Sequence, residues 1–189
     1  MKSKLADERI NYTGRELRSH WVMERFGLEG DVIVAFRGSC MVSGEDLVDR
    51  EDFDLGNIVA GKDMLHFIVE MSGAGLLGIT LAQRLLCSIT QDVLNSELSK
   101  SAAGRVVDRK GDDLYVGQGK LSVSVATVSP VSGLIHLGLN ITTEGVPVEA
   151  ACLAGMSIDY KWIAGEVLAR FAGEIDSCTR AASKVRPVV

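Results

Sequence analysis

Two neighbouring segments with the pattern of β-strands constrain the fold of this chain most strongly. Residues 120–128 alternate between polar and apolar side chains, and residues 134–142 form a second run rich in strand-forming residues. The intervening residues 129–133, Ser-Pro-Val-Ser-Gly, are typical of a turn. A turn this short joins strands that run in opposite directions, so the sequence predicts an antiparallel hairpin.

Further helices and strands are expected around this hairpin. Apolar residues recur at helical spacing in residues 13–26, 76–98 and 159–175. Runs of β-forming residues predict strands at residues 31–36, 64–70, 105–107 and 113–116. The acidic residues 43–61 are expected to form a solvated loop. We therefore predict an α+β fold, a central mainly antiparallel or mixed sheet with flanking helices, in a single domain over residues 1–189.

The composition argues against several classes of protein. Twenty-five Asp and Glu against 20 Lys and Arg give a net charge of −5, so no nucleic acid and no membrane surface are expected as partners. No apolar stretch approaches the roughly 18 residues that span a bilayer, and the charged first residues do not form a secretory signal. Four scattered cysteines without a CxxC pair fit a reducing cytoplasm. Neither GxGxxG after a strand nor the P-loop motif is present, so these phosphate cradles are missing.

The densest polar cluster of the sequence contains the first candidates for ligand binding. Asp112 and Asp113 are expected in a tight turn, and Lys120 enters the alternating strand that follows. Because strand side chains alternate, we expect Lys120, Ser122 and Ser124 on one face, opposite a buried apolar face. This polar face could line a pocket in which Lys120 stabilises charge on an anionic or carbonyl oxygen. The alternative is the solvent face of an ordinary hairpin.

The second strand of the hairpin carries His136, Gly138 and Asn140 on one face. Gly138 would leave room for a ligand, and this line of residues would widen the pocket beside Lys120. The alternative is a bulge at Gly138 and a hydrogen-bonded His136.

A second group of candidates lies around His66 and Glu70, whose spacing of four puts them on one face of either a helix or a strand. With Asp63 they could ligate a metal or form an acid–base pair. A buried ion pair or a hydrogen-bonded histidine is the alternative.

Isolated polar residues complete the candidate set. Arg37 and Gly38 are expected at the end of a buried strand, where charged residues commonly meet ligands. Arg84, next to Gln83 in the long helix, either faces solvent, which we favour, or contacts a ligand. Cys152 is either a nucleophile or a small buried residue.

These residues resemble a known family along most of the chain. The sequence resembles the domain-of-unknown-function family 366, on residues 19–21, 34–38, 63–70, 83–86, 111–115, 120–124, 135–136 and 184–186. The resemblance implies no activity. It implies the fold of the catalytic domains of class II aminoacyl-tRNA synthetases and of biotin and lipoate protein ligases.

A weaker resemblance to the biotin and lipoate ligases supports that fold. The turn at residues 112–114 is similar to their Asn-Asp-hydrophobic turn, residues 120–124 to their lysine strand, and residues 138–141 to their Gly-Ile-Asn-Val strand. In those ligases the lysine contacts the acyl carboxylate and the adenylate phosphate, which implies this role for Lys120. Their arginine- and glycine-rich adenylate loop is not visible here, and Val123 stands where they have glycine.

The sequence therefore predicts a small-molecule ligand and leaves its chemistry open. One hypothesis is an enzyme that binds a carboxylic acid, an acyl-adenylate or a nucleotide beside Lys120 and performs ligase or acyl-transfer chemistry. ATP and Mg²⁺ are then conceivable cofactors, with Asp112 or Asp113 as oxygen ligands. The alternatives are a non-catalytic binding module of the same fold and a metal-assisted hydrolase that uses His66, Glu70 and His136. A homodimer is left open.

Overall fold

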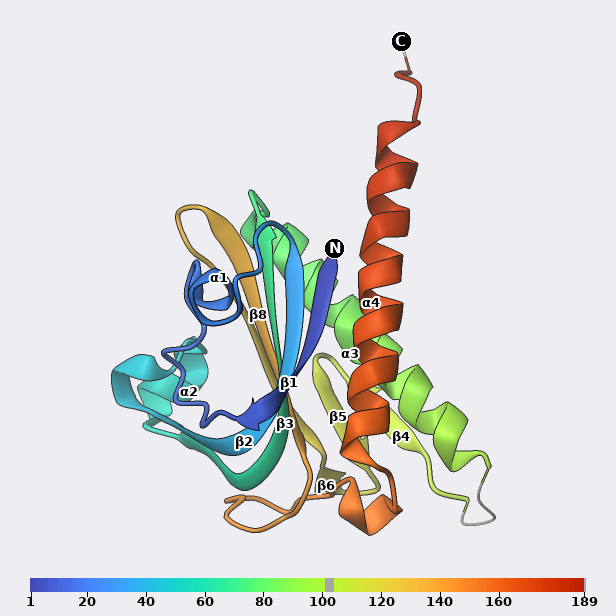
Figure 1. Ribbon diagram of the computed structural model, residues 1–189. Coiled ribbons are helices and arrows are strands. Elements are labelled where there is room, and N and C mark those ends of the chain that lie inside the picture. The colour runs from blue at the N-terminus through green and yellow to red at the C-terminus, as the bar shows by residue number, and fades with distance from the viewer. Residues whose placement is uncertain (101–103, 189) are drawn as a thin grey trace.

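The described part of the computed structural model, residues 1–100 and 104–188, contains a five-stranded mixed sheet and a three-stranded sheet (Figure 1). Across the larger sheet the strands follow the order β1 (Lys2–Arg9), β2 (Val32–Ser43), β3 (Ile58–Ser72), β8 (Ser132–Asn140) and β7 (Ser122–Val128). The β1–β2 pair is parallel, and the other pairs are antiparallel. The predicted α+β class and the predicted hairpin, β7–β8, are confirmed.

The smaller sheet interrupts the long strand that the sequence predicted at residues 120–128. It consists of β4 (Val107–Lys110), β5 (Asp113–Val116) and β6 (Gly119–Lys120). The strand predicted at residues 105–107 overlaps β4 only at Val107. The chain leaves β6 at Leu121, which is fully buried and donates its N–H to the Leu114 carbonyl. Lys120 and Ser122 therefore lie on different strands. The prediction that they share one face of a single strand is wrong.

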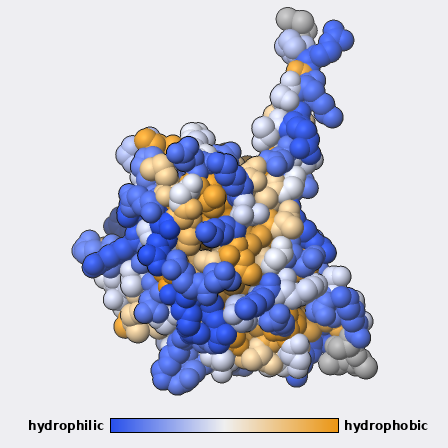
Figure 2. All heavy atoms as spheres, viewed as in Figure 1, coloured by the Kyte–Doolittle hydropathy of each residue, from blue (hydrophilic) through white to orange (hydrophobic). Residues whose placement is uncertain are grey.

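Two long helices cover one face of the larger sheet. Helix α3 (Leu76–Leu98) packs against β7 and β8, and helix α4 (Tyr160–Ser183) packs against β1 and β2. Fully buried side chains such as Leu86 and Phe171 join this core, each contributing roughly 1.5–3 kcal/mol through removal from water. Both helices were predicted, although α4 continues past residue 175. Its last residues are exposed and project beyond the body, where polar side chains predominate (Figure 2).

The opposite face of the sheet is covered by the segment before β2 and by the segment between β2 and β3. Helix α1 (Trp21–Phe26) is much shorter than the helix predicted at residues 13–26, because His20 adopts a positive φ of 66° and Tyr12 pairs with Cys40 as a β-bridge. The acidic residues 43–61 are not only a loop. They form the 3₁₀ turn η1 (Gly44–Asp46), helix α2 (Arg50–Leu55) and the start of β3.

The connection from β8 to α4 contains the 3₁₀ turn η2 (Ala154–Met156). The N-terminus of α4 is capped by Asp159, whose carboxylate accepts hydrogen bonds from the N–H groups of Lys161 and Trp162. Within the described residues no helix is long and apolar enough to cross a membrane.

Gly38 allows the N-terminal segment to cross strand β2. A Cβ atom at Gly38 would lie 1.8 Å from the carbonyl oxygen of Ile10. The strand does not end at Arg37 and Gly38, as expected, because β2 continues to Ser43. Gly38 thus serves close backbone packing rather than a ligand.

We expect Gly38→Ala to lower the free energy of unfolding by about 1–3 kcal/mol or more, because the new methyl group overlaps backbone that cannot move freely. Urea denaturation measures this loss. Gly78→Ala in α3 is the matched control, since nothing lies within 4 Å of its Cβ position. An unchanged unfolding free energy for Gly38→Ala would contradict the crossing.

Candidate functional site

A cavity of about 700 Å³ lies on the sheet face opposite α3 and α4 and reaches the edge strand β7. Seven of the residues singled out in the sequence line it, namely Asp112, Asp113, Lys120, Ser122, Ser124, His136 and Asn140. The other candidates are not among its lining residues, namely Arg37, Gly38, Asp63, His66, Glu70, Arg84, Gly138 and Cys152. The tertiary structure thus gathers the polar residues of β5–β8 and leaves the other candidates outside.

Lys120 reaches the cavity from β6, opposite Tyr115 on β5. Its ammonium nitrogen lies 2.8 Å from a carboxylate oxygen of Asp113, and about a third of the side chain is exposed. The Lys120 carbonyl accepts a hydrogen bond from the Nδ2 of Asn140 at 3.1 Å. The same Nδ2 donates to the Ala151 carbonyl at 3.1 Å, so buried Asn140 fixes the backbone from which the lysine projects.

Asp112 is held by the helix α3. Its carboxylate accepts hydrogen bonds from Gln83 Nε2 and from Arg84 Nη1, each at 2.9 Å. Gln83 is buried and also donates to Ser124 Oγ at 2.9 Å, so the expectation that this part of α3 faces solvent is wrong for Gln83. Arg84 does not line the cavity itself, and its contact with the lining is the ion pair with Asp112.

Ser122 has a structural role in this arrangement. It is buried, and its Oγ accepts the N–H of Leu114 at 2.8 Å. This hydrogen bond ties β7 to β5, and so fixes the smaller sheet against the edge of the larger one.

Two imidazoles meet beneath the cavity. His66 Nδ1 lies 3.0 Å from His136 Nε2, and the His136 ring stacks on Tyr12 with centroids 3.7 Å apart and planes 8° apart. Burial lowers the pKa of His66 to about 4 and lowers the pKa of His136 well below its usual value. Both rings are therefore neutral at neutral pH.

His66 and Glu70 do not form the acid–base pair considered from the sequence, and for His66 the alternative of a hydrogen-bonded histidine holds. The Glu70 carboxylate accepts hydrogen bonds from the His20 N–H at 2.9 Å and from Ser132 Oγ at 2.8 Å. Asp63 is paired with Arg9 and Arg37. Residues 1–100 and 104–188 contain no cluster of three or more His, Cys, Asp or Glu side chains that could hold a metal ion, so the hydrolase hypothesis has no metal centre here.

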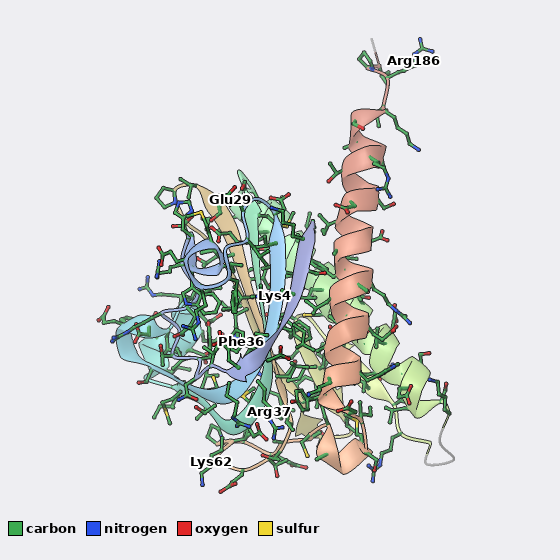
Figure 3. The ribbon with its side chains drawn as sticks, in the orientation of Figure 1. Lys4, Glu29, Phe36, Arg37, Lys62 and Arg186 are labelled. Atoms are coloured by element: carbon green, nitrogen blue, oxygen red, sulfur yellow. The ribbon has the colours of Figure 1, made fainter. Side chains whose placement is uncertain are left out.

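Arg37 and Gly138 also have structural roles: Arg37 forms an ion pair, and Gly138 is packed against a side chain. Arg37 Nε donates to Asp63 at 2.7 Å and its guanidinium lies 4.8 Å from the Tyr160 ring centroid, at the lower end of the sheet in Figure 3. This ion pair holds the pKa of Asp63 below its usual value. A Cβ atom at Gly138 would lie 3.0 Å from the Met64 methyl group, so Met64 fills the space expected for a ligand.

The sequence reasoning missed the outer wall of the cavity. Tyr12 forms part of its floor, and apolar residues close its side, namely Val42, Leu47, Val48, Ile58, Val59, Ala60, Val146, Pro147 and Val148. Four carboxylates of the acidic segment also line it, namely Asp46, Asp49, Glu51 and Asp52. No motif marks these residues, because they reach the cavity only when the segment folds back over the sheet.

The lining does not fit a magnesium nucleotide. Asp112 and Asp113, the expected metal ligands, are paired with Arg84 and Lys120. Among the described lining residues Lys120 is the one lysine or arginine, beside six carboxylates. Polyphosphate binding by side chains calls for several cations, which the described lining does not offer.

Known proteins resemble this chain at two levels. The family model of the domain of unknown function DUF366 matches residues 1–186. An uncharacterised protein of Methanocaldococcus jannaschii is 34% identical over 189 residues, covering 96% of this chain and 83% of that protein. A solved protein of unknown function from Pyrococcus horikoshi is 38% identical, with a TM-score of 0.92 over 100% of this chain and 99% of that chain.

More distant structures share the fold. Biotin protein ligase from Aquifex aeolicus, solved in complex with biotin and ATP, is 15% identical with a TM-score of 0.58, covering 93% of this chain and 69% of that chain. Lipoate-protein ligase A bound with ATP is 16% identical with a TM-score of 0.55, covering 92% and 85%. The expected biotin and lipoate ligase-like fold is confirmed.

We expect the neutral histidine pair to make stability depend on pH. The unfolded chain binds protons on His66 near pH 6.5, whereas the folded chain does so near pH 4. This contribution to stability is fully present above about pH 6.5 and is lost as the pH falls towards 4. For His66 alone, moving from pH 7 to pH 5 should cost on the order of 1–3 kcal/mol.

Urea denaturation at the two pH values measures this effect. The double variant His66→Leu, His136→Phe should lose less stability on acidification than the unchanged protein. His20→Asn, at an exposed histidine, is the control and should not alter the difference. Equal pH dependence in the double variant and the unchanged protein would contradict neutral burial.

Proposed function

The chain belongs to the family of the domain of unknown function DUF366, and we propose that it binds a small carboxylic acid, or an activated acyl derivative, with the acid oxygen next to Lys120. The observation that carries the proposal is the position of the Lys120 ammonium in a cavity of about 700 Å³ with an apolar wall. That volume is within the range typical of small-molecule sites. The ligase-like fold supports the same class of ligand.

Lys120 has the capacity for this role although it is paired. An ammonium group has three N–H donors, and Asp113 occupies one of them. The remaining donors can contact the carboxylate or carbonyl oxygen of a ligand. In acyl transfer, negative charge develops on the carbonyl oxygen, and a fixed ammonium in a partly desolvated cavity stabilises it.

A non-catalytic binding module is the second candidate function, and one observation favours it. Six carboxylates against one lysine line the cavity in the described chain, and no cysteine lines it there. Cys152, the nucleophile considered from the sequence, is absent from this lining, and its sulfur instead accepts the N–H of Gly155 at 3.4 Å. Such a cavity can hold an acid without supplying a covalent nucleophile.

We expect octanoic acid, lipoic acid or biotin to raise the midpoint of thermal unfolding. A ligand at 100 times its Kd adds about 2.7 kcal/mol to the stability of the folded state. Lys120→Ala should weaken binding of the same acid roughly tenfold or more, the value of a lost hydrogen bond to a charged group. Isothermal titration calorimetry measures both affinities.

Lys62→Ala is the matched control, because Lys62 is an exposed lysine that pairs with Glu144 and does not line the cavity. It should leave the affinity unchanged. Equal affinity in Lys120→Ala and the unchanged protein would remove Lys120 from the site.

Two reaction assays separate the candidate functions. The first mixes the protein with ATP and the bound acid and measures pyrophosphate. The second offers an S-octanoyl thioester together with a primary amine as the acyl acceptor, and measures release of the thiol and formation of the octanoyl amide. We expect thiol release without pyrophosphate, because the lining suits an acyl group better than a nucleotide. Acid binding with neither product would identify a binding module.

A further inference from the structure

The cavity contains a polar group that the proposed role of Lys120 does not use. His136 on β8 is 3% exposed and lines the cavity floor beside Tyr12 and Val125. His136 and Asn140 are on the same strand face, four residues apart, which corresponds to about 13 Å along a strand. An elongated ligand at Lys120 could therefore reach the imidazole with its other end.

The orientation of the His136 ring is fixed from two sides. Its Nε2 pairs with His66 Nδ1 at 3.0 Å, and its face stacks on Tyr12. In the described chain, His66 Nε2 is fully buried and has no hydrogen-bond partner. Within residues 1–100 and 104–188 no hydrogen-bond partner of His136 Nδ1 is found, and this atom is not one of the fully buried unsatisfied atoms, so we assign it to the cavity side of the ring.

The surroundings of His66 decide which nitrogen of His136 carries a proton. The carbonyl groups of Gly38 and Ser39 favour a proton on the His66 ring, although neither forms a hydrogen bond of normal geometry with Nε2. Because His66 Nδ1 is engaged by His136 and these carbonyl groups favour a proton on the ring, we assign the proton of neutral His66 to Nε2. His66 Nδ1 then accepts from His136 Nε2, and the Nδ1 of His136 is left as a lone pair.

Resting on the proposed acid site, we infer that His136 contacts the ligand directly and accepts, through Nδ1, a hydrogen bond from an uncharged O–H or N–H group at the end remote from Lys120. We take the group as uncharged because Val125 lies opposite His136 and Tyr12 stacks on its ring, and removing a cation from water beside this surface costs several kcal/mol. His66 is a positioning residue that sets the proton on His136. The ligand class is a medium-length acid with a hydroxyl or amide N–H at its far end.

Three synthetic acids test this inference by calorimetry. Octanoic acid has no polar far end, 8-hydroxyoctanoic acid has a donor, and 8-methoxyoctanoic acid has an acceptor only. We expect the hydroxy acid to bind about threefold to tenfold more tightly than octanoic acid, the effect of one net hydrogen bond. The methoxy acid should show no gain. A gain for the methoxy acid, or none for the hydroxy acid, would overturn the inference.

His136→Phe is the matched variant, because phenylalanine keeps the stack on Tyr12 and removes both nitrogens. It should abolish the preference for the hydroxy acid while octanoic acid still binds. If octanoic acid binds and the preference survives in His136→Phe, His136 does not contact the ligand.

A measurement on the unchanged protein keeps the inference testable without any variant. Long-range proton–nitrogen NMR of the ligand-free protein distinguishes the two ring nitrogens of each histidine. We expect His136 to carry its proton on Nε2 and His66 on Nε2. A proton on Nδ1 of His136 would overturn the assigned role. If none of the three acids binds, the proposed acid site is wrong. The spectrum then still shows which ring nitrogen of His136 carries the proton.

Discussion

The buried amide of Asn140 is the interaction on which the geometry of the cavity depends. One nitrogen donates to the carbonyls of Lys120 and Ala151, two segments that follow different turns of the chain. These bonds act with the hydrogen bond between Ser122 and Leu114 to hold the smaller sheet at the end of β8. Because the amide is buried, breaking one of its hydrogen bonds leaves an unsatisfied group that costs about 1–3 kcal/mol. These hydrogen bonds hold the backbone at Lys120, and the side chain projects from that backbone.

Charge pairing gives the cavity its chemical character. Asp112 and Asp113 each face a cation, Arg84 and Lys120, so the carboxylate turn is neutralised before any ligand enters. The acidic segment adds further carboxylates at the outer wall. A polyanion would meet repulsion there, whereas a single carboxylate beside Lys120 adds one charge next to a free ammonium donor. This distribution of charge supports the proposed ligand, which has one acidic end and an uncharged remainder.

Much of the fold could be predicted from the sequence because its elements have local causes. The β7–β8 hairpin follows from alternation and a turn, and α3 from a long apolar periodicity. The helix expected at residues 13–26 is mostly absent, because pairing of Tyr12 with β2 and the crossing at Gly38 override helical spacing. The face assigned to Lys120, Ser122 and Ser124 was wrong for a related reason. The chain turns at Leu121, which is held by hydrogen bonds to the backbone of Leu114 and Asn140 on other strands, and no local pattern indicates these contacts.

By itself the sequence determined the class of fold, the hairpin and the long helices, because each depends on residues that are close along the chain. The tertiary structure alone decided which polar residues share a cavity. It places His136 in contact with His66, seventy positions away in the sequence. It pairs the Glu70 carboxylate with His20 and Ser132 by hydrogen bonds, and it packs Met64 into the space at Gly138. The physical reason is that burial and hydrogen bonding act on atoms that meet in space. The register of strands and the path of the covering segments choose those partners, and neither is written in the local spacing of residues.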